Sequence, residues 1–112
     1  MPKNAYDIAT TSFGPESLTA DPDEWARAMH CVLGTLKRDG VALLFAMIGS
    51  TGYSSSGVRA PATPITIHDL LQITKPWLNN IRLSYVHSLG DMRTADDPDT
   101  YEGTAVLVGT RK

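Results

Sequence analysis

The sequence predicts a small α/β domain with its elements in the order β-α-β-α-β-β. An unbroken apolar run at Val41–Ile48 is typical of a parallel strand that is covered on both faces. A helical pattern lies between this run and an earlier short strand, and such a βαβ unit makes the two strands parallel. The last two strands are joined by a segment too short for a helical crossover, so they are expected to run antiparallel.

The composition excludes several classes of protein. With 112 residues the chain has room for one domain, and a net charge of −2 offers no basic face for nucleic acid. Cys31 is the only cysteine, which favours a reduced, cytoplasmic setting without disulfides. The first residues lack the apolar core of a signal peptide, and the longest apolar run is too short to cross a membrane.

The first strand is expected at Tyr6–Ser12 and the first helix at Pro22–Arg38. Asp21 is a suitable N-cap, Glu24 stands at capping-box spacing, and Gly40 is a candidate C-cap. One face of this helix is apolar at helical spacing, through Trp25, Met29, Val32, Leu33 and Leu36.

The region after the buried strand contains a long loop and a second helix. We expect the loop over Gly49–Pro64, where serines and prolines gather; it is either a functional loop or a surface excursion. The helix is predicted to start near Thr66, with Asp69 at capping-box spacing, and to end before Pro76. Its inner face carries Ile67, Leu70, Leu71 and Thr74.

The last two strands are predicted at Ile81–Leu89 and Tyr101–Thr110, with an acidic loop between them. In this arrangement the first strand and Val41–Ile48 end at the same edge of the sheet. The segments that follow them are therefore expected to lie close together, at the edge where open α/β sheets bind ligands.

Several kinds of site are not supported. His30, His68 and His87 are scattered, and no ligand pair stands at zinc-like spacing, so no metal site is expected. The turn Gly49–Gly52 could cradle a phosphate, but the lysine of a phosphate-binding loop is missing. No G-x-S-x-G motif supports a catalytic serine.

Glu16 is the acid of most interest, because it follows the first strand at the expected ligand edge. Its carboxylate could bind a cationic or hydroxyl-bearing ligand, or it could cap a nearby backbone amide. Tyr53 is either an aromatic wall for a ligand or a cover for the core. Asp99, just before the final strand, has the position of a turn residue.

Several stretches of the sequence stand in a characteristic order and spacing, namely Phe13–Pro22, Trp25 with Ala28, Leu36–Leu44, Ala46–Met47, Gly49–Ser50 and Tyr53. In this order they resemble S-adenosylmethionine-dependent methyltransferases, in particular the nicotinamide, phenylethanolamine and thioether methyltransferases and their bacterial relatives. The resemblance reaches the last strand. Where that family has L-K-P-G-G before a buried strand, this chain has Leu36–Gly40, without the proline and one glycine.

The resemblance implies a Rossmann-like class I methyltransferase fold of which residues 1–112 are only the carboxyl-terminal half. The half that carries most contacts to S-adenosyl-L-methionine has no counterpart in this sequence. By position, the resemblance assigns Ser12 and Phe13 to the cofactor side. It assigns four residues to the substrate side, namely Glu16, Ser50, Tyr53 and, with a looser alignment, Asp99.

The implied activity is methyl transfer to N, S or O of a small acceptor, by an enzyme of which this chain alone is an incomplete part. An alternative is a non-catalytic α/β module, or truncated pseudo-enzyme, that associates with itself or a partner chain through an open sheet edge at residues 6–12. A nucleotide-binding dehydrogenase half is disfavoured, because the sequence has no G-x-G-x-x-G motif.

Overall fold

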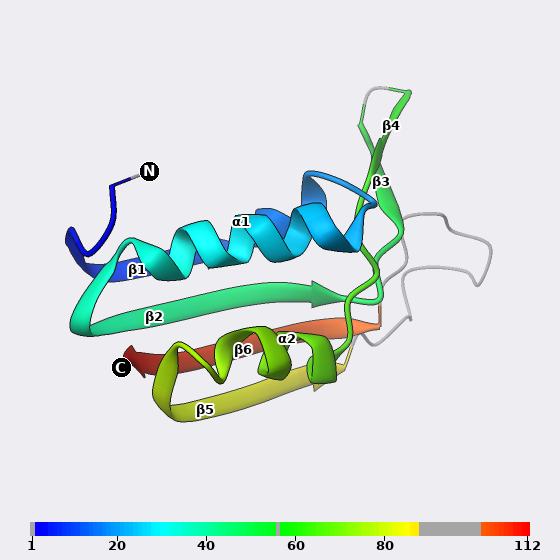
Figure 1. Ribbon diagram of the computed structural model, residues 1–112. Helices are drawn as coiled ribbons and strands as arrows, with labels where there is room; N and C mark the ends of the chain where they lie inside the picture. The colour runs from blue at the N-terminus through cyan, green and yellow to red at the C-terminus, as the bar shows by residue number, and fades with distance from the viewer. Residues whose placement is uncertain (1, 56, 88–101) are drawn as a thin grey trace.

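A computed structural model describes residues 2–55, 57–87 and 102–112, and in this part of the chain four strands form one sheet (Figure 1). The strands are β1 (Tyr6–Ser12), β2 (Leu36–Ile48), β5 (Leu78–His87) and β6 (Gly103–Arg111). Their order across the sheet is β1-β2-β6-β5. The β1–β2 pair is parallel, whereas β6 runs antiparallel to both β2 and β5. The predicted fold class and the reversed final pair are thus confirmed.

The first helix is shorter than predicted, and its last expected turn belongs to a strand. Helix α1 spans Pro22–Gly34; Asp21 caps it, since its Oδ1 accepts a 2.9 Å hydrogen bond from the Asp23 N–H. The Thr35 hydroxyl donates to the Val32 carbonyl at 2.6 Å and closes the final turn. Leu36, counted in the helical face by its spacing, instead starts β2 opposite Tyr6 and is fully buried there.

The start of β2 explains why the expected C-cap is wrong. The β1–β2 register shifts between Tyr6 and Ile8, and Asp39 takes a positive φ of 65° at this irregularity. Gly40 follows inside the strand, where an added Cβ would lie 3.0 Å from the Asp7 carbonyl oxygen. The glycine therefore permits close approach of two strands and does not cap a helix.

The segment predicted as a loop contains a small hairpin, formed by β3 (Gly52–Ser55) and β4 (Val58–Pro61). Helix α2 (Ile67–Thr74) follows where it was predicted. Its capping box is complete: the Asp69 N–H donates to Thr66 Oγ1 at 3.0 Å, and the Thr66 N–H donates to Asp69 Oδ2 at 2.9 Å. A 3₁₀ helix, η1 (Pro15–Ser17), lies between β1 and α1 in the chain.

The hydrophobic core lies on one face of the sheet, where both helices pack (Figure 1). Alternate residues of β2 and β6 meet apolar side chains from α1 and α2 there, as the period-two pattern of strands requires. The strands contribute Leu36, Ala42, Leu44, Ala46, Ile48, Leu78, Ala105 and Leu107, and the helices contribute Trp25, Met29, Leu33 and Leu70.

The opposite face of the sheet is not covered by a helix of the described part of the chain. Val41 is 36% exposed, and Leu43, Phe45 and Met47 are half-buried, so the expectation that Val41–Ile48 is covered on both faces does not hold here. On the neighbouring strand Ile8, opposite Val41, is 67% exposed. The apolar run is explained by one buried face and one apolar but uncovered face.

The ends of the last two strands also differ from the prediction. Strand β5 starts earlier, at Leu78, and β6 starts later, at Gly103. The predicted ends Leu89 and Tyr101, and the loop between them, lie outside the described residues. None of the helices in the described ranges combines the length and the apolar character needed to cross a membrane.

Candidate functional site

The carboxyl ends of β1 and β2 bring three separate segments together. The Phe13 N–H still donates to the Phe45 carbonyl at 2.9 Å, after which the two chains diverge. The Thr63 N–H donates to the Glu16 carbonyl at 2.7 Å, and the Gly49 N–H donates to the Ile65 carbonyl at 3.0 Å. Residues 63–65 therefore connect η1 with the turn that follows β2, at the edge predicted from the sequence.

Glu16 is the most deeply buried ionisable side chain at this edge, with 2% of its surface exposed. The backbone N–H groups of Glu16 and Met47 hydrogen-bond to its carboxyl group. One oxygen, Oε1, is buried and has no hydrogen-bond partner among the described residues. The carboxyl of Glu16 thus caps backbone N–H groups, as one of the two predicted alternatives had it, but its Oε1 takes no part in this.

Burial raises the pKa of Glu16 from 4.5 to about 7, although the two backbone hydrogen bonds oppose this effect. Desolvation disfavours the charged form, and here it outweighs the stabilisation that the N–H donors give to the carboxylate. At neutral pH the group is therefore divided between its acid and its base form. Such a carboxyl can either donate or accept a proton near physiological pH.

Ser50 lies in the turn after β2, at the same edge as Glu16, and its hydroxyl bonds within its own turn. It is 1% exposed, and its hydroxyl donates to the Gly52 carbonyl at 3.4 Å. The Ala62 N–H donates to the Thr51 carbonyl at 3.3 Å, which ties this turn to the segment that also holds Glu16. Ser50 thus belongs to the same edge and supports its backbone.

Of the other four predicted site residues, the structure describes Ser12 and Phe13 fully. Ser12 is exposed at the end of β1, and Phe13, half-buried, takes a left-handed φ of 60° that is uncommon for a residue with a Cβ. Tyr53 belongs to β3, but its side chain lies outside the described part of the structure. Asp99 also falls outside the described residues.

One residue of this edge, Thr63, was not expected from the sequence. Thr63 is 2% exposed, and its hydroxyl donates to the Thr19 carbonyl at 2.6 Å, so it anchors the loop over Glu16. Gly49, which was expected in a turn directly after an apolar run, has a φ of 76°, and a Cβ there would lie 2.8 Å from Cγ of Glu102. Nothing in the sequence marks Thr63.

No group of three or more His, Cys, Asp or Glu side chains that could hold a metal ion occurs in the described ranges. His30, on α1, accepts a hydrogen bond from Trp77, while His68 lies in the first turn of α2 and His87 at the end of β5. Cys31 is exposed and unpaired by any disulfide. Glu16 is the buried charged side chain among the described residues of this edge.

Comparison with known proteins identifies the fold. No protein-family model matches the sequence, and no curated protein matches it either. Solved structures do match, and those described here are S-adenosylmethionine-dependent methyltransferases. One from Methanosarcina mazei matches with a TM-score of 0.62 at 13% identity, over 98% of this chain and 61% of its own. One from Archaeoglobus fulgidus matches with a TM-score of 0.63 at 9% identity, over 99% and 62%.

A third match, from Thermotoga maritima, is named as a possible histamine N-methyltransferase. It has a TM-score of 0.62 at 12% identity, over 100% of this chain and 59% of its own. The chain thus spans about three fifths of the length of these solved structures. The four-stranded sheet and its two helices have the fold of the carboxyl-terminal part of these enzymes.

Proposed function

We propose that this chain is the carboxyl-terminal part of a small-molecule methyltransferase that uses S-adenosylmethionine. The observation that carries the proposal is the buried carboxyl of Glu16, whose Oε1 lacks a partner at the ligand-binding edge of a methyltransferase-like sheet. A buried polar atom without a partner is costly, and a bound acceptor would remove that cost. We treat residues 1–112 as one partial domain.

We propose that the described residues provide one side of the cofactor site. Ser12 ends β1 and Phe13 follows it, and they would contact S-adenosylmethionine through a hydroxyl and an aromatic side chain. The edge described here has no second buried carboxylate that could hold a ribose diol. We therefore propose that most cofactor contacts come from residues outside this chain, and that the isolated chain is inactive.

When bound, the cofactor would supply an electrophilic methyl group, and Glu16 would act on the acceptor. With a pKa near 7, the carboxylate form of Glu16 can accept a hydrogen bond or a proton from the attacking N, S or O atom through Oε1. Ser50 would hold the neighbouring turn in place, and Tyr53 and Asp99 complete the proposed substrate side. Catalysis of this type depends largely on orientation in a pocket with little water.

A cationic or amine-bearing acceptor suits this arrangement best. The buried Glu16 has no cationic partner among the salt bridges of the described residues, so an ammonium group would supply the missing positive charge. The name of the Thermotoga maritima protein, a possible histamine N-methyltransferase, agrees with such an acceptor. The same proposal includes acceptors that take the methyl group on a sulfur or oxygen atom.

The experiment titrates small amines, with histamine as the first probe, into protein carrying ¹³C-labelled glutamate. We expect the carboxyl signal of Glu16 to shift saturably and its pKa to fall, since a bound cation stabilises the carboxylate. Glu16→Gln should abolish binding, whereas Glu24→Gln, at an exposed position of α1, should leave it unchanged. Equal binding by Glu16→Gln would contradict the assigned role.

Calorimetry tests the second half of the proposal. We expect no tight binding when S-adenosylmethionine is titrated into the isolated chain, because too few of its contacts are available. A dissociation constant in the micromolar range, which corresponds to a binding free energy of about −8 kcal/mol, would show instead that this chain suffices for cofactor binding.

We also propose a second candidate function, an association module, because of the exposed surface at β1. Among the described residues β1 pairs only with β2, and Tyr6 and Ile8 on it are 52% and 67% exposed. An unpaired strand edge next to an apolar sheet face favours pairing with another chain. The association proposed is of two copies of this chain through β1.

Light scattering over a range of concentrations tests this association. The chain should become dimeric as its concentration rises, and Ile8→Lys should shift the dissociation constant upward by at least about tenfold, since a charge opposes burial at the edge. Leu18→Lys, at a residue that is 74% exposed after η1, is the matched control and should dimerise normally. A stable monomer at high concentration would exclude the association.

A further inference from the structure

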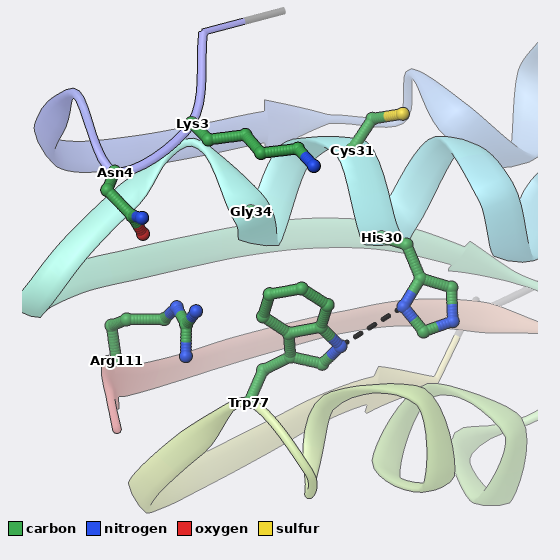
Figure 2. A pocket seen from close by; sticks show the side chains of 7 residues that line it. All are labelled: Lys3, Asn4, His30, Cys31, Gly34, Trp77 and Arg111. Carbon is green, nitrogen blue, oxygen red and sulfur yellow. Dashed lines mark hydrogen bonds between the residues drawn. The ribbon is translucent and has the colours of Figure 1, made fainter.

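A pocket of about 460 Å³ opens at the end of the sheet that lies opposite Glu16 (Figure 2). Its walls come from the amino ends of the parallel strands: Asn4 precedes β1, Gly34 precedes β2, and Trp77 precedes β5. Arg111 joins them because β6 runs in the reverse direction and ends here. The pocket is therefore separate from the proposed methyltransferase site, which follows the carboxyl ends of β1 and β2.

Trp77 forms the centre of the pocket wall and is held from two sides. Its indole Nε1–H donates to Nδ1 of His30 on α1 at 3.1 Å. The guanidinium carbon of Arg111 lies 4.6 Å from the centroid of the Trp77 ring, in cation–π contact. The ring is thus preorganised between a helix and a strand, and no large rearrangement is needed for a ligand to use it.

Gly34 packs close to the indole. A Cβ at this position would lie 3.8 Å from the Cη2 atom of Trp77, which is ordinary van der Waals contact. An alanine would therefore fit, whereas a longer side chain would extend beyond this contact into the pocket that Gly34 lines.

The polar groups of the pocket are donors and cations. Lys3 and Arg111 are positively charged, Asn4 adds an amide, and none of the lining residues is acidic. His30 accepts the indole hydrogen at Nδ1, so its neutral ring carries the hydrogen on Nε2 as a further donor. Figure 2 shows the guanidinium of Arg111 directed toward Trp77, and the side chain of Lys3 extending toward Cys31.

Arg111 also has an unused donor. Its Nη1 donates to the Lys112 carbonyl at 3.3 Å, while its buried Nε has no hydrogen-bond partner in the described part of the chain. The Nε edge of a guanidinium can bind the two oxygens of a carboxylate side by side. A carboxylate bound there would remove the cost of the unpaired N–H.

We propose that this pocket binds a small aromatic carboxylate. Its carboxylate would pair with Arg111 and Lys3, and its ring would lie against Trp77 in the pocket that Gly34 also lines. The pocket volume is within the range of about 300–1,000 Å³ that is typical of small-molecule sites. The proposal does not depend on methyltransferase activity, because it uses none of the residues of the Glu16 edge.

Nuclear magnetic resonance of ¹⁵N-labelled protein tests the site with benzoate as the probe. The chain has two tryptophans, and Trp25, which is 5% exposed in the core, serves as the internal reference. We expect a saturable shift of the Trp77 indole N–H signal and no shift for Trp25. Benzyl alcohol, which keeps the ring but lacks the charge, should give no saturable shift. Equal shifts of both indoles, or equal binding of the alcohol, would overturn the proposal.

Variants locate the site. Arg111→Met should weaken benzoate binding at least about tenfold, since a hydrogen bond to a charged group is worth more than the 1.4 kcal/mol of a tenfold change. Gly34→Met should abolish binding by filling the pocket, while both variants keep the dispersed spectrum of a folded chain. Arg82→Met, on β5 opposite Val108 of the uncovered face, is the control and should bind normally. Unchanged binding by Arg111→Met or Gly34→Met would refute the proposal.

Discussion

The carboxyl group of Glu16 accepts a hydrogen bond from the backbone N–H of Met47, at the point where β2 continues beyond the end of β1. Pairing between the two strands stops near Phe45, and beyond that point the Glu16 carboxyl, and not a β1 carbonyl, accepts the hydrogen of the Met47 N–H. The residue therefore has a structural role, and we propose a chemical one. The first fixes its position, and the second depends on the oxygen that this hydrogen bond leaves unused.

Stability should fall as the pH rises from about 4.5 to about 7, because of Glu16. The folded protein keeps the proton of this carboxyl up to a pKa of about 7, whereas the unfolded chain releases it near 4.5. The contribution is therefore fully present below pH 4.5 and lost above pH 7, and it amounts to at most about 3 kcal/mol. Urea unfolding at a series of pH values measures it.

Glu16→Gln is the matched variant for this dependence. Its neutral amide keeps an oxygen for the Met47 N–H, so the variant should lose the Glu16 component of the pH profile and become more stable than the parent at pH 8. Glu24→Gln, at an exposed position, should keep the profile of the parent. If Glu16→Gln follows the same profile as the parent, the pH dependence of stability does not come from Glu16.

Gly103→Ala should destabilise the fold by about 1–3 kcal/mol, through overpacking at the start of β6. A Cβ there would lie 2.6 Å from the Tyr85 hydroxyl oxygen and would also collide with the backbone carbonyl of Val86. Gly34→Ala is the control, since its Cβ meets only ordinary contacts and alanine favours a helix. Thermal unfolding should show opposite signs for the two variants, and equal shifts would contradict the assigned packing.

Thr66→Ala should cost about 1 kcal/mol, because it removes the acceptor of the Asp69 N–H at the start of α2. Thr66→Ser keeps a hydroxyl at the same position and should restore most of the stability. Chemical denaturation of both variants measures the difference. Equal loss in the serine variant would mean that the threonine methyl group, and not the cap, is important here.

Leu33→Ala should cost about 2.7–5 kcal/mol, the range for a leucine removed from a well-packed core. Leu33 is fully buried between α1 and the sheet. Leu18→Ala, at a residue that is 74% exposed, should change the free energy of unfolding by less than about 0.5 kcal/mol. Similar losses in both variants would show that α1 does not pack as described.

Much of this fold could be predicted from local patterns. The Tyr6–Ser12 strand, the caps at Asp21 and Thr66 and the antiparallel final pair all follow from short-range features, and the structure confirms them. The edge where Glu16 and Gly49 meet also follows, because strand direction alone decides where parallel strands end. The methyltransferase-like fold was indicated by the order of such stretches and agrees with the solved structures.

The errors have one physical origin: spacing along the chain does not specify the backbone around a residue. Leu36 fits the helical pattern of α1, but its burial is satisfied equally well in β2 once Thr35 closes the helix. The hairpin at Gly52–Pro61 contains two glycines, three serines and a proline, which are typical of loops. Pairing with Tyr6, far away in the sequence, decided the conformation of Leu36, whereas pairing across a short turn decided that of the hairpin.

The sequence by itself determined the order of the four sheet strands and the two helices, the caps and the place of Glu16 after the first strand, since these depend on neighbours along the chain. Only the tertiary structure decided that both helices cover one face of the sheet, that Met47 holds one side of the Glu16 carboxyl, and that Trp77 meets Arg111 at the opposite end. Burial, and with it the raised pKa of Glu16, arises from residues far away in the sequence. For that reason the position of Glu16 could be predicted, but its protonation could not.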